Sequence, residues 1–162
     1  MHPQSESIDG YVVSTPLRPE AISVVWQNIK PGIEEIKRKT PTATWMIEDV
    51  YHQLRAGHCA LCLILYEGVI VGFFVTEDQI DRFTSARKLF IWLAWIKPGY
   101  PRAFDIAVRS IEAMAKAQGY TGMYGTSHRD GWERRLGRPD SGWIRKEVVW
   151  ERNFSSTDEE RH

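Results

Sequence analysis

Apolar residues in the first part of the chain follow mostly helical spacing. Residues 11–15 predict a short strand, and residues 20–29 carry an apolar side chain every three to four positions, as one face of a helix does. Pro31 and Gly32 predict the end of that helix, because proline removes an amide donor and glycine is a poor helix former. A second short helical piece is predicted over residues 33–39.

The next segment gives the clearest amphipathic helix of the N-terminal half. Its apolar positions, again three to four residues apart, are Trp45, Met46, Val50, Tyr51 and Leu54. Thr42 or Thr44 is the expected N-cap, because a hydroxyl accepts the unpaired amide hydrogens of a first helical turn. Gly57 is the expected stop. Two or three helices are therefore predicted between the first strand and the second.

The apolar period then changes to that of strands. Residues 58–66 and 69–76 predict an antiparallel pair joined by the tight turn between them. Gly72, inside the second of these strands, indicates a bulge or a close approach of the backbone. A polar stretch, residues 77–85, follows the pair.

Residues 87–97 are apolar on both faces, as a central buried strand is. Trp92 and Trp95 are three positions apart, so we expect them to point to opposite faces of that strand. A turn rich in proline and glycine leads into a helix predicted over residues 102–118. The last third predicts a strand over 121–125, a short helix over 130–136 and a strand over 143–154.

One domain is expected from these elements. The chain has 162 residues, of which 43% are apolar and 26% charged, the composition of an ordinary globular protein. We expect a single domain over residues 11–154, between a flexible N-terminus of residues 1–10 and a polar tail of residues 155–162.

The charge balance limits the partners. The 21 basic side chains offset the 21 acidic ones, so no overall field attracts nucleic acid or an anionic membrane. The longest apolar run, residues 60–66, is too short to span a bilayer, and residues 1–7 lack the pattern of a signal peptide. We expect no membrane partner, no main role in nucleic-acid binding, and a place in the cytoplasm of the producing cell.

Cys59 and Cys62, the only cysteines, form a C-x-x-C pattern. On a strand this offset separates their Cα atoms by about 10 Å and puts the side chains on opposite faces, which excludes a disulfide. A metal site needs more ligands, such as His52 or His128. Two buried core thiols are therefore the favoured interpretation, and no metal is expected.

The order of predicted elements, β-α-α-β-β-β-α-β-α-β, resembles that of the GCN5-related N-acetyltransferase (GNAT) fold. The features that carry the resemblance lie within residues 45–152: the Glu67-Gly68 hairpin, the strand-to-helix step at 96–102, the helix end at 117–120 and the segment 125–137. The resemblance implies an α/β (α+β) domain with a mixed, mostly antiparallel twisted sheet and helices on both faces. Within it, residues 129–137 look most like the small GNAT-like proteins of tailed bacteriophages, some of which are virion or assembly components.

The resemblance also implies a place for coenzyme A. In GNAT enzymes a glycine-containing loop after the fourth strand holds the diphosphate with its backbone N–H groups and the following helix N-terminus. The equivalent segment, Lys97 to Phe104, has one glycine and two prolines. Each proline removes a donor, and Phe104 stands about where close approach favours glycine. We favour a structural turn; if acetyl-CoA does bind, Lys97, Gly99 and Arg102 are its expected contacts.

Acyl transfer to an amine further needs a base and a donor for the departing thiolate. GNAT enzymes commonly place a Glu on the central strands and a Tyr on the helix after the fifth strand. Residues 87–97 hold no carboxylate, and the short helix offers Trp132 instead of Tyr. The candidates that remain are Tyr124, His128 and Glu133, with His128 as first choice of base because it titrates near neutral pH. A merely solvated histidine is the competing interpretation.

A basic and aromatic group follows in the sequence. It consists of Arg129, Trp132, Arg134, Arg135 and Arg138. Arginine and tryptophan are common where partners dock, and together they also suit phosphate or base stacking. The alternative is a solvated helix face whose arginines pair with nearby carboxylates.

Two functions from different classes are consistent with these observations. The main interpretation is a phage-type GNAT-like protein that serves as a virion or assembly component. Its partners would be other virion or assembly proteins or further copies of itself, its acyl-CoA site would be degenerate, no cofactor would be needed, and some of it would reside in the virion. The alternative is an acetyl-CoA-dependent N-acetyltransferase with an atypical donor loop.

Overall fold

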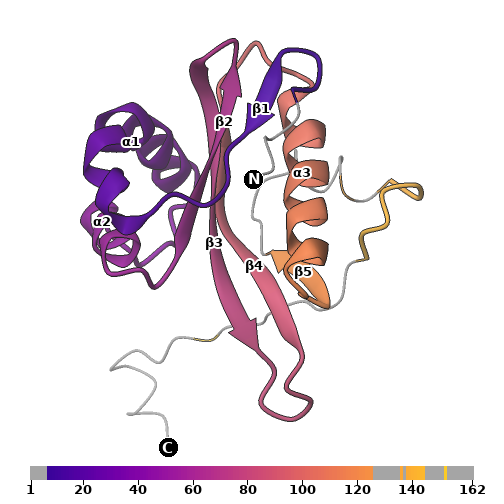
Figure 1. Cartoon of the computed structure of the whole chain (residues 1–162). Helices are drawn as coiled ribbons and strands as arrows, with labels where there is room; N and C mark the ends of the chain where they lie inside the picture. The colour runs from indigo at the N-terminus through magenta and orange to yellow at the C-terminus, as the bar shows by residue number, and fades with distance from the viewer. Residues whose placement is uncertain (1–6, 126–135, 137, 145–151, 153–162) are drawn as a thin grey trace, which may run out of the picture. The chain divides into compact units, whose positions relative to one another are not determined.

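The computed structural model describes residues 7–125, 136, 138–144 and 152, and the chain divides into two compact units, Met1–His128 and Arg129–His162. The first unit contains the helices and strands labelled in Figure 1: β1 (Tyr11–Val13), α1 (Ile22–Lys39), α2 (Ile47–Arg55), β2 (Ala60–Tyr66), β3 (Val69–Ile80), β4 (Arg87–Ile96), α3 (Ala103–Ala117) and β5 (Gly122–Gly125). A 3-10 turn, η1 (Pro19–Ala21), directly precedes α1. A single domain over residues 11–154 stays a prediction.

The five strands form one sheet in the order β1-β2-β3-β4-β5. Neighbouring strands run antiparallel, except β4 and β5, which run parallel and are joined by the crossover helix α3. Helices α1 and α2 cover one face of the sheet and α3 covers the other (Figure 1). The expected mixed, mostly antiparallel α/β architecture is confirmed.

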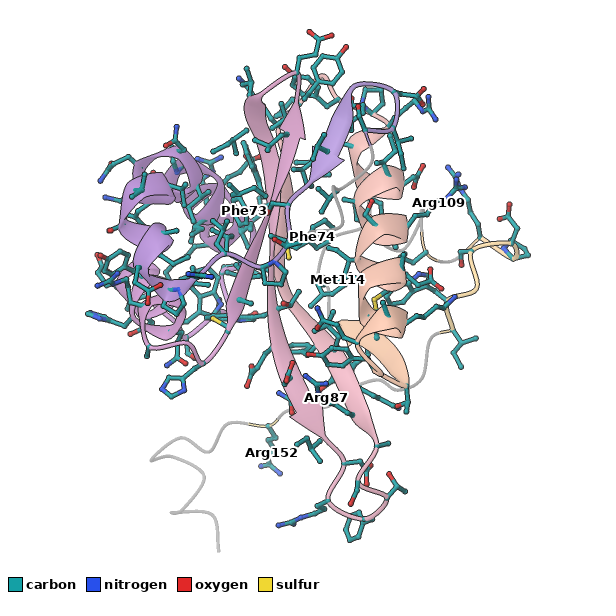
Figure 2. All side chains as sticks on the ribbon, in the orientation of Figure 1. Phe73, Phe74, Arg87, Arg109, Met114 and Arg152 are labelled. Carbon is teal, nitrogen blue, oxygen red and sulfur yellow. The ribbon has the colours of Figure 1, made fainter. Side chains whose placement is uncertain are left out.

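The core has two halves, one on each face of the sheet. Phe73 and Phe74 are consecutive in β3 and point to opposite faces (Figure 2). Phe73 belongs to the apolar cluster beneath α1 and α2, whereas Phe74 packs against Phe104 of α3 with ring centroids 6.5 Å apart. Both phenylalanines are fully buried, so β3 is the central strand of the unit.

The predicted break at Pro31 is wrong, because α1 continues through it as one helix. An interior proline costs about 3 kcal/mol through its missing hydrogen bond and its ring. Ile29, Ile33 and Ile36 lie on both sides of Pro31 and are all buried on the stripe that faces the sheet. Burial of such side chains contributes about 1.5–3 kcal/mol each, which outweighs the cost of the proline.

Gly32 allows α1 to lie close to the sheet. A Cβ atom there would sit 2.6 Å from the Trp95 ring and 2.7 Å from the Phe73 ring. These two rings stack with centroids 5.9 Å apart, and the Trp95 indole N–H donates to the Glu35 carboxylate at 2.5 Å. The glycine therefore marks a helix–sheet contact, whereas the pattern indicated a helix end.

Helix α2 begins later than predicted, and neither Thr42 nor Thr44 caps it. The backbone N–H of Met46 donates to the Asp49 carboxylate at 2.6 Å. A carboxylate in the first turn accepts a free amide hydrogen and also suits the positive end of the helix dipole. A charged acceptor thus takes the place of the expected hydroxyl.

A β-bulge in β4 reverses the expected direction of one tryptophan. The register between β3 and β4 shifts between Val75 and Thr76, and Trp92 is the extra residue on β4. Trp92 and Trp95 consequently both pack against the cluster beneath α1 and α2. The expectation that they point to opposite faces is wrong, because one added residue inverts the alternation.

Strand β3 extends to Ile80, beyond its predicted end at residue 76. Its polar second half pairs with the first half of β4, so that Glu77 lies opposite Phe90 and Gln79 opposite Lys88. The first part of the polar stretch is therefore held in the sheet. This places Glu77 on a strand next to the bulge.

Replacing Gly32 by Ala is expected to lower the free energy of unfolding by about 1–2 kcal/mol. Overpacking against the Trp95 and Phe73 rings costs about 1–3 kcal/mol, against a gain of up to about 1 kcal/mol in helix propensity. Urea unfolding measures the change. The control is Gly122→Ala, where a Cβ meets nothing within 4 Å. A Gly32→Ala variant at least as stable as wild type would contradict this account.

Candidate functional site

Strand β5 accompanies β4 over only part of its length. The paired residues run from Lys88 with Gly122 to Ile91 with Gly125. In the part of the chain that the structure describes, the edge of β4 from Trp92 to Ile96 has no partner strand on that side. An unpaired edge presents backbone N–H and C=O groups to whatever lies beside it.

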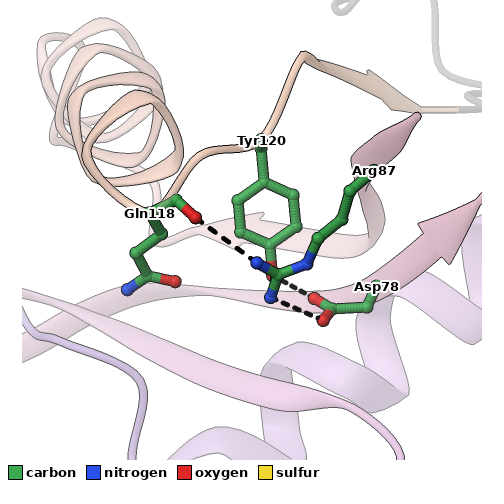
Figure 3. Close-up of polar contacts among 4 residues, drawn as sticks. All are labelled: Asp78, Arg87, Gln118 and Tyr120. Atoms are coloured by element: carbon green, nitrogen blue, oxygen red, sulfur yellow. Dashed lines mark hydrogen bonds and ion pairs between the residues drawn. The ribbon is translucent and has the colours of Figure 1, made fainter. Parts of the chain in front are cut away.

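Arg87 fixes the point at which the two strands come together (Figure 3). Its guanidinium donates to Asp78 at 2.9 Å, to the Gln118 carbonyl at 3.3 Å and to the Tyr120 hydroxyl at 3.0 Å, and it lies 4.1 Å from the Tyr120 ring centroid. The backbone N–H of Thr121 donates to the Arg87 carbonyl at 2.8 Å. The end of α3 and the start of β5 are thereby fastened to the start of β4.

The protonation states in this network agree with its hydrogen bonds. Burial and the bond to Asp78 raise the pKa of Tyr120 to about 12, so its hydroxyl stays a donor to Asp78. Burial opposes ionisation of Asp78, but hydrogen bonds from Tyr120 and Arg87 lower its pKa overall. The network is thus a neutral phenol and a charged pair at neutral pH.

The loop between β4 and α3 contains the expected phosphate contacts. Gly99 has a φ of +99°, and a Cβ placed there meets nothing within 4 Å, so this position is open. Lys97 is exposed, and its backbone N–H donates to Val71 within the sheet. Pro98 and Pro101 have no amide hydrogen. The donors that this loop can offer are therefore few and centre on Gly99.

Phe104 does not obstruct the loop. It is buried and packs against Phe74, so its ring points into the core. Arg102, the N-cap of α3, forms an ion pair with Asp9. Asp9 lies in a tight turn within the segment assigned to the flexible N-terminus, where Ile8 and Tyr11 exchange two backbone hydrogen bonds of 2.9 and 2.8 Å.

A cavity of about 300 Å³ lies between α2 and the sheet, next to the bulge. Its walls combine three aromatic rings with polar side chains and one thiol, and its lining residues are Trp45, Asp49, Gln53, Cys59, Glu77, Phe90 and Trp92. Trp92, the bulge residue, connects this cavity to the unpaired edge of β4. The sequence did not indicate Glu77, because residues 77–85 show only a polar stretch after the predicted strand.

Tyr124 is the predicted catalytic residue that the structure brings to this region. Its ring stacks on Phe90 with centroids 4.9 Å apart. Burial, followed by the nearby charge of Glu77, raises the pKa of Tyr124. Tyr124 is therefore a neutral hydrogen-bond donor close to the cavity wall.

Of the other predicted catalytic and interaction residues, Arg138 alone is among the described residues. His128, Glu133, Arg129, Trp132, Arg134 and Arg135 lie outside the described residues. Arg138 is exposed in the second unit, where its carbonyl accepts from the Ser141 N–H at 3.0 Å. The proposed roles of all these residues stay predictions.

The cysteines are buried free thiols, as predicted. Cys59 belongs to the cluster beneath α1 and α2, while Cys62 lies opposite Phe74 on the other face. Among residues 7–125 and the described part of the second unit, no group of acidic, histidine and cysteine side chains is arranged to hold a metal ion. No helix within those same stretches is both long and apolar enough to cross a membrane.

Comparison with known proteins gives structural but not sequence relatives. No family model matches the chain, and no curated protein sequence does. Among solved structures, an aminoglycoside acetyltransferase from an uncultured soil metagenomic sample, in complex with sisomicin, has 10% identity and a TM-score of 0.65 over 91% of this chain and 97% of the other. A ribosomal-protein-alanine N-acetyltransferase from Brucella melitensis biovar Abortus 2308 has 11% identity and a TM-score of 0.66 over 90% and 99%.

A third similar structure is the aminoglycoside N-acetyltransferase AAC(6')-Iy in complex with CoA. It has 12% identity and a TM-score of 0.63 over 88% of this chain and 94% of the other. The chain has the GNAT fold. At these identities the likeness shows the fold alone, because proteins of one fold can have different functions that depend on their sites.

The two thiols give a prediction that depends on pH. Burial raises the pKa of both Cys59 and Cys62 to about 12, so at pH 8 only about one thiol in ten thousand is ionised. Ellman's reagent is expected to label neither in native buffer and both in urea. Between pH 9, the ordinary pKa of a thiol, and pH 12 the two thiols ionise in the unfolded chain but not in the folded chain. The free energy of unfolding is therefore expected to fall as the pH rises through this range. Rapid labelling of the native protein would disprove this burial.

Proposed function

We propose that this protein is an N-acyltransferase that uses acyl-coenzyme A, with acetyl-CoA as the expected donor. The observation that carries the proposal is the edge of β4 that has no partner strand among the described residues. It begins at the Trp92 bulge beside the cavity and ends at Ile96, directly before the loop of Gly99 and the start of α3. One edge thus leads from the cavity, where the acyl group would lie, to the loop of Gly99, where the phosphates would lie.

The β4 edge suits the pantetheine arm of such a donor, and the loop after it offers a few groups for the phosphates. From Trp92 to Ile96 an extended strand covers about 13 Å, similar to the span of a pantetheine arm, whose amides can pair with the strand edge. Gly99 is open, Lys97 is exposed, and α3 directs its N-terminus at the same loop. Bound acetyl-CoA would supply the thioester that an amine attacks.

The enzyme interpretation is favoured over that of a virion or assembly scaffold. Phe104 packs inward instead of filling the loop, which removes one of the arguments for a degenerate site. Two of the similar structures are named N-acetyltransferases, and one of these two is in complex with CoA. None of the findings favours a phage origin.

Acetyl-CoA is expected to bind in the micromolar range when measured by isothermal titration calorimetry. Lys97→Ala is expected to weaken binding about twofold to fivefold, because exposed ion pairs contribute about 0.2–1 kcal/mol. Lys116→Ala is the matched control, since Lys116 is an exposed lysine far along α3 that pairs with Glu112. No heat of binding at millimolar acetyl-CoA would refute the proposal and restore the scaffold interpretation.

Asp9 is expected to compete with the donor for Arg102. Replacing Asp9 by Asn removes the carboxylate partner of Arg102, so the guanidinium becomes available to phosphate. Both side chains are more than half exposed, so the gain in affinity for acetyl-CoA is expected to be about twofold to fivefold. Titration of the variant beside wild type measures it. Equal or weaker binding would show that Arg102 does not contact the donor.

A further inference from the structure

One of the two carboxylates that line the cavity beside the Trp92 bulge has no partner among the residues that the structure describes. Glu77 is half-buried, and no hydrogen bond or ion pair to it exists among the residues that the structure describes. Asp49, the other carboxylate of the lining, already accepts the Met46 N–H at the start of α2. Glu77 is therefore the group whose negative charge is left for a ligand.

Aromatic rings flank this charge. Glu77 lies opposite Phe90 in the sheet, and Trp92 and Trp45 meet edge to face with centroids 6.0 Å apart. Trp45 already accepts a cation on its ring, since the Lys37 ammonium lies 5.1 Å from the centroid. Aromatic faces beside a carboxylate attract a cation through cation–π interaction and through charge–charge attraction, and the same groups repel an anion.

The size of the cavity indicates how much of a ligand it can enclose. Its volume of about 300 Å³ is at the lower end of the range of about 300–1,000 Å³ that small-molecule sites span. A single ring or short alkyl chain with one ammonium group fits such a volume. A polycation of several sugar rings does not fit inside it.

We propose that the acyl acceptor is a compact primary amine with an aromatic or aliphatic body, bound as a single cation with its ammonium at Glu77. This inference rests on the proposed N-acyltransferase function and names its substrate class. Glu77 reaches the site from β3 and supplies the carboxylate that β4 lacks. Its position opposite Phe90 puts it next to Trp92, where the donor edge begins.

The reaction balances with the groups at hand. Glu77 takes a proton from the ammonium, and the freed nitrogen lone pair forms the C–N bond to the acyl carbon. The C–S bond breaks, and its electron pair leaves on the coenzyme A thiolate. Tyr124, kept protonated by its raised pKa, donates a hydrogen bond to that sulfur. The proton that the nitrogen loses as the amide forms neutralises the thiolate, and Glu77 returns its own proton to water.

Binding of phenethylamine at neutral pH tests the acceptor site without any coenzyme. Titration calorimetry, with tryptophan fluorescence as a second signal, is expected to show saturable binding, and Glu77→Gln is expected to weaken it about tenfold. Glu48→Gln, an exposed carboxylate of α2 outside the cavity, is the control that should change nothing. Phenethyl alcohol, which has the same body without the charge, is expected to bind at least tenfold more weakly to wild type.

Steady-state kinetics separates the role of Glu77 in amine binding from its role in proton transfer. With saturating phenethylamine and acetyl-CoA, release of free thiol is expected, and Glu77→Gln is expected to lower kcat by about 10²-fold or more, beyond its effect on KM. Equal binding of the alcohol and the amine, or an unchanged affinity and kcat in Glu77→Gln, would overturn the inference. So would a preference for sisomicin over phenethylamine. Failure of acetyl-CoA to bind would instead refute the proposed function, because amine binding is measured without it.

Discussion

Among the described residues, strand pairing on this side of β4 ends at Ile91, and the free edge from Trp92 to Ile96 is the constraint on which the candidate site depends. Two local features lie at this point. The Arg87 network fastens the start of β5 to the start of β4, and the bulge at Trp92 changes the course of β4 directly after the last paired residue. Bulges bend a strand and increase its twist. Within the described part of the chain, the rest of β4 has a free edge that leads to the loop of Gly99.

The same bulge also shapes the face of the sheet that α1 and α2 cover. Because it inverts the alternation, Trp92 and Trp95 lie on one side, where Trp95 packs beneath α1 at Gly32 and Trp92 forms a wall of the cavity. One inserted residue therefore opens an edge toward the donor side and adds an aromatic wall toward the acceptor side. A donor and an acceptor can approach the same point on β4 from different directions, as acyl transfer requires.

Much of the fold was predictable from local pattern. The hairpin of β2 and β3, the apolar strand β4 and the helix α3 follow from apolar period and turn residues, which act over a few positions. The helix end predicted at Pro31 and Gly32 was wrong, because burial of the isoleucines around them stabilises the helix by more than these two residues destabilise it. Glu77 was missed for a related reason, since only pairing with β4 makes that polar segment a strand. Tyr124 was named as a candidate from the sequence, but its proximity to Glu77 was not.

The amino-acid sequence by itself determined the order of the elements as far as β5 and the burial of Cys59 and Cys62, because these depend on apolar spacing along the chain. The GNAT-like architecture was an expectation from the resemblance of that order to a known fold. Tertiary structure alone decided which way Trp92 points, that Phe104 leaves the loop open, that Arg102 pairs with Asp9, and that Glu77 faces an aromatic cavity. Each of these depends on register or on contact between distant segments, and a single shifted residue reverses the outcome.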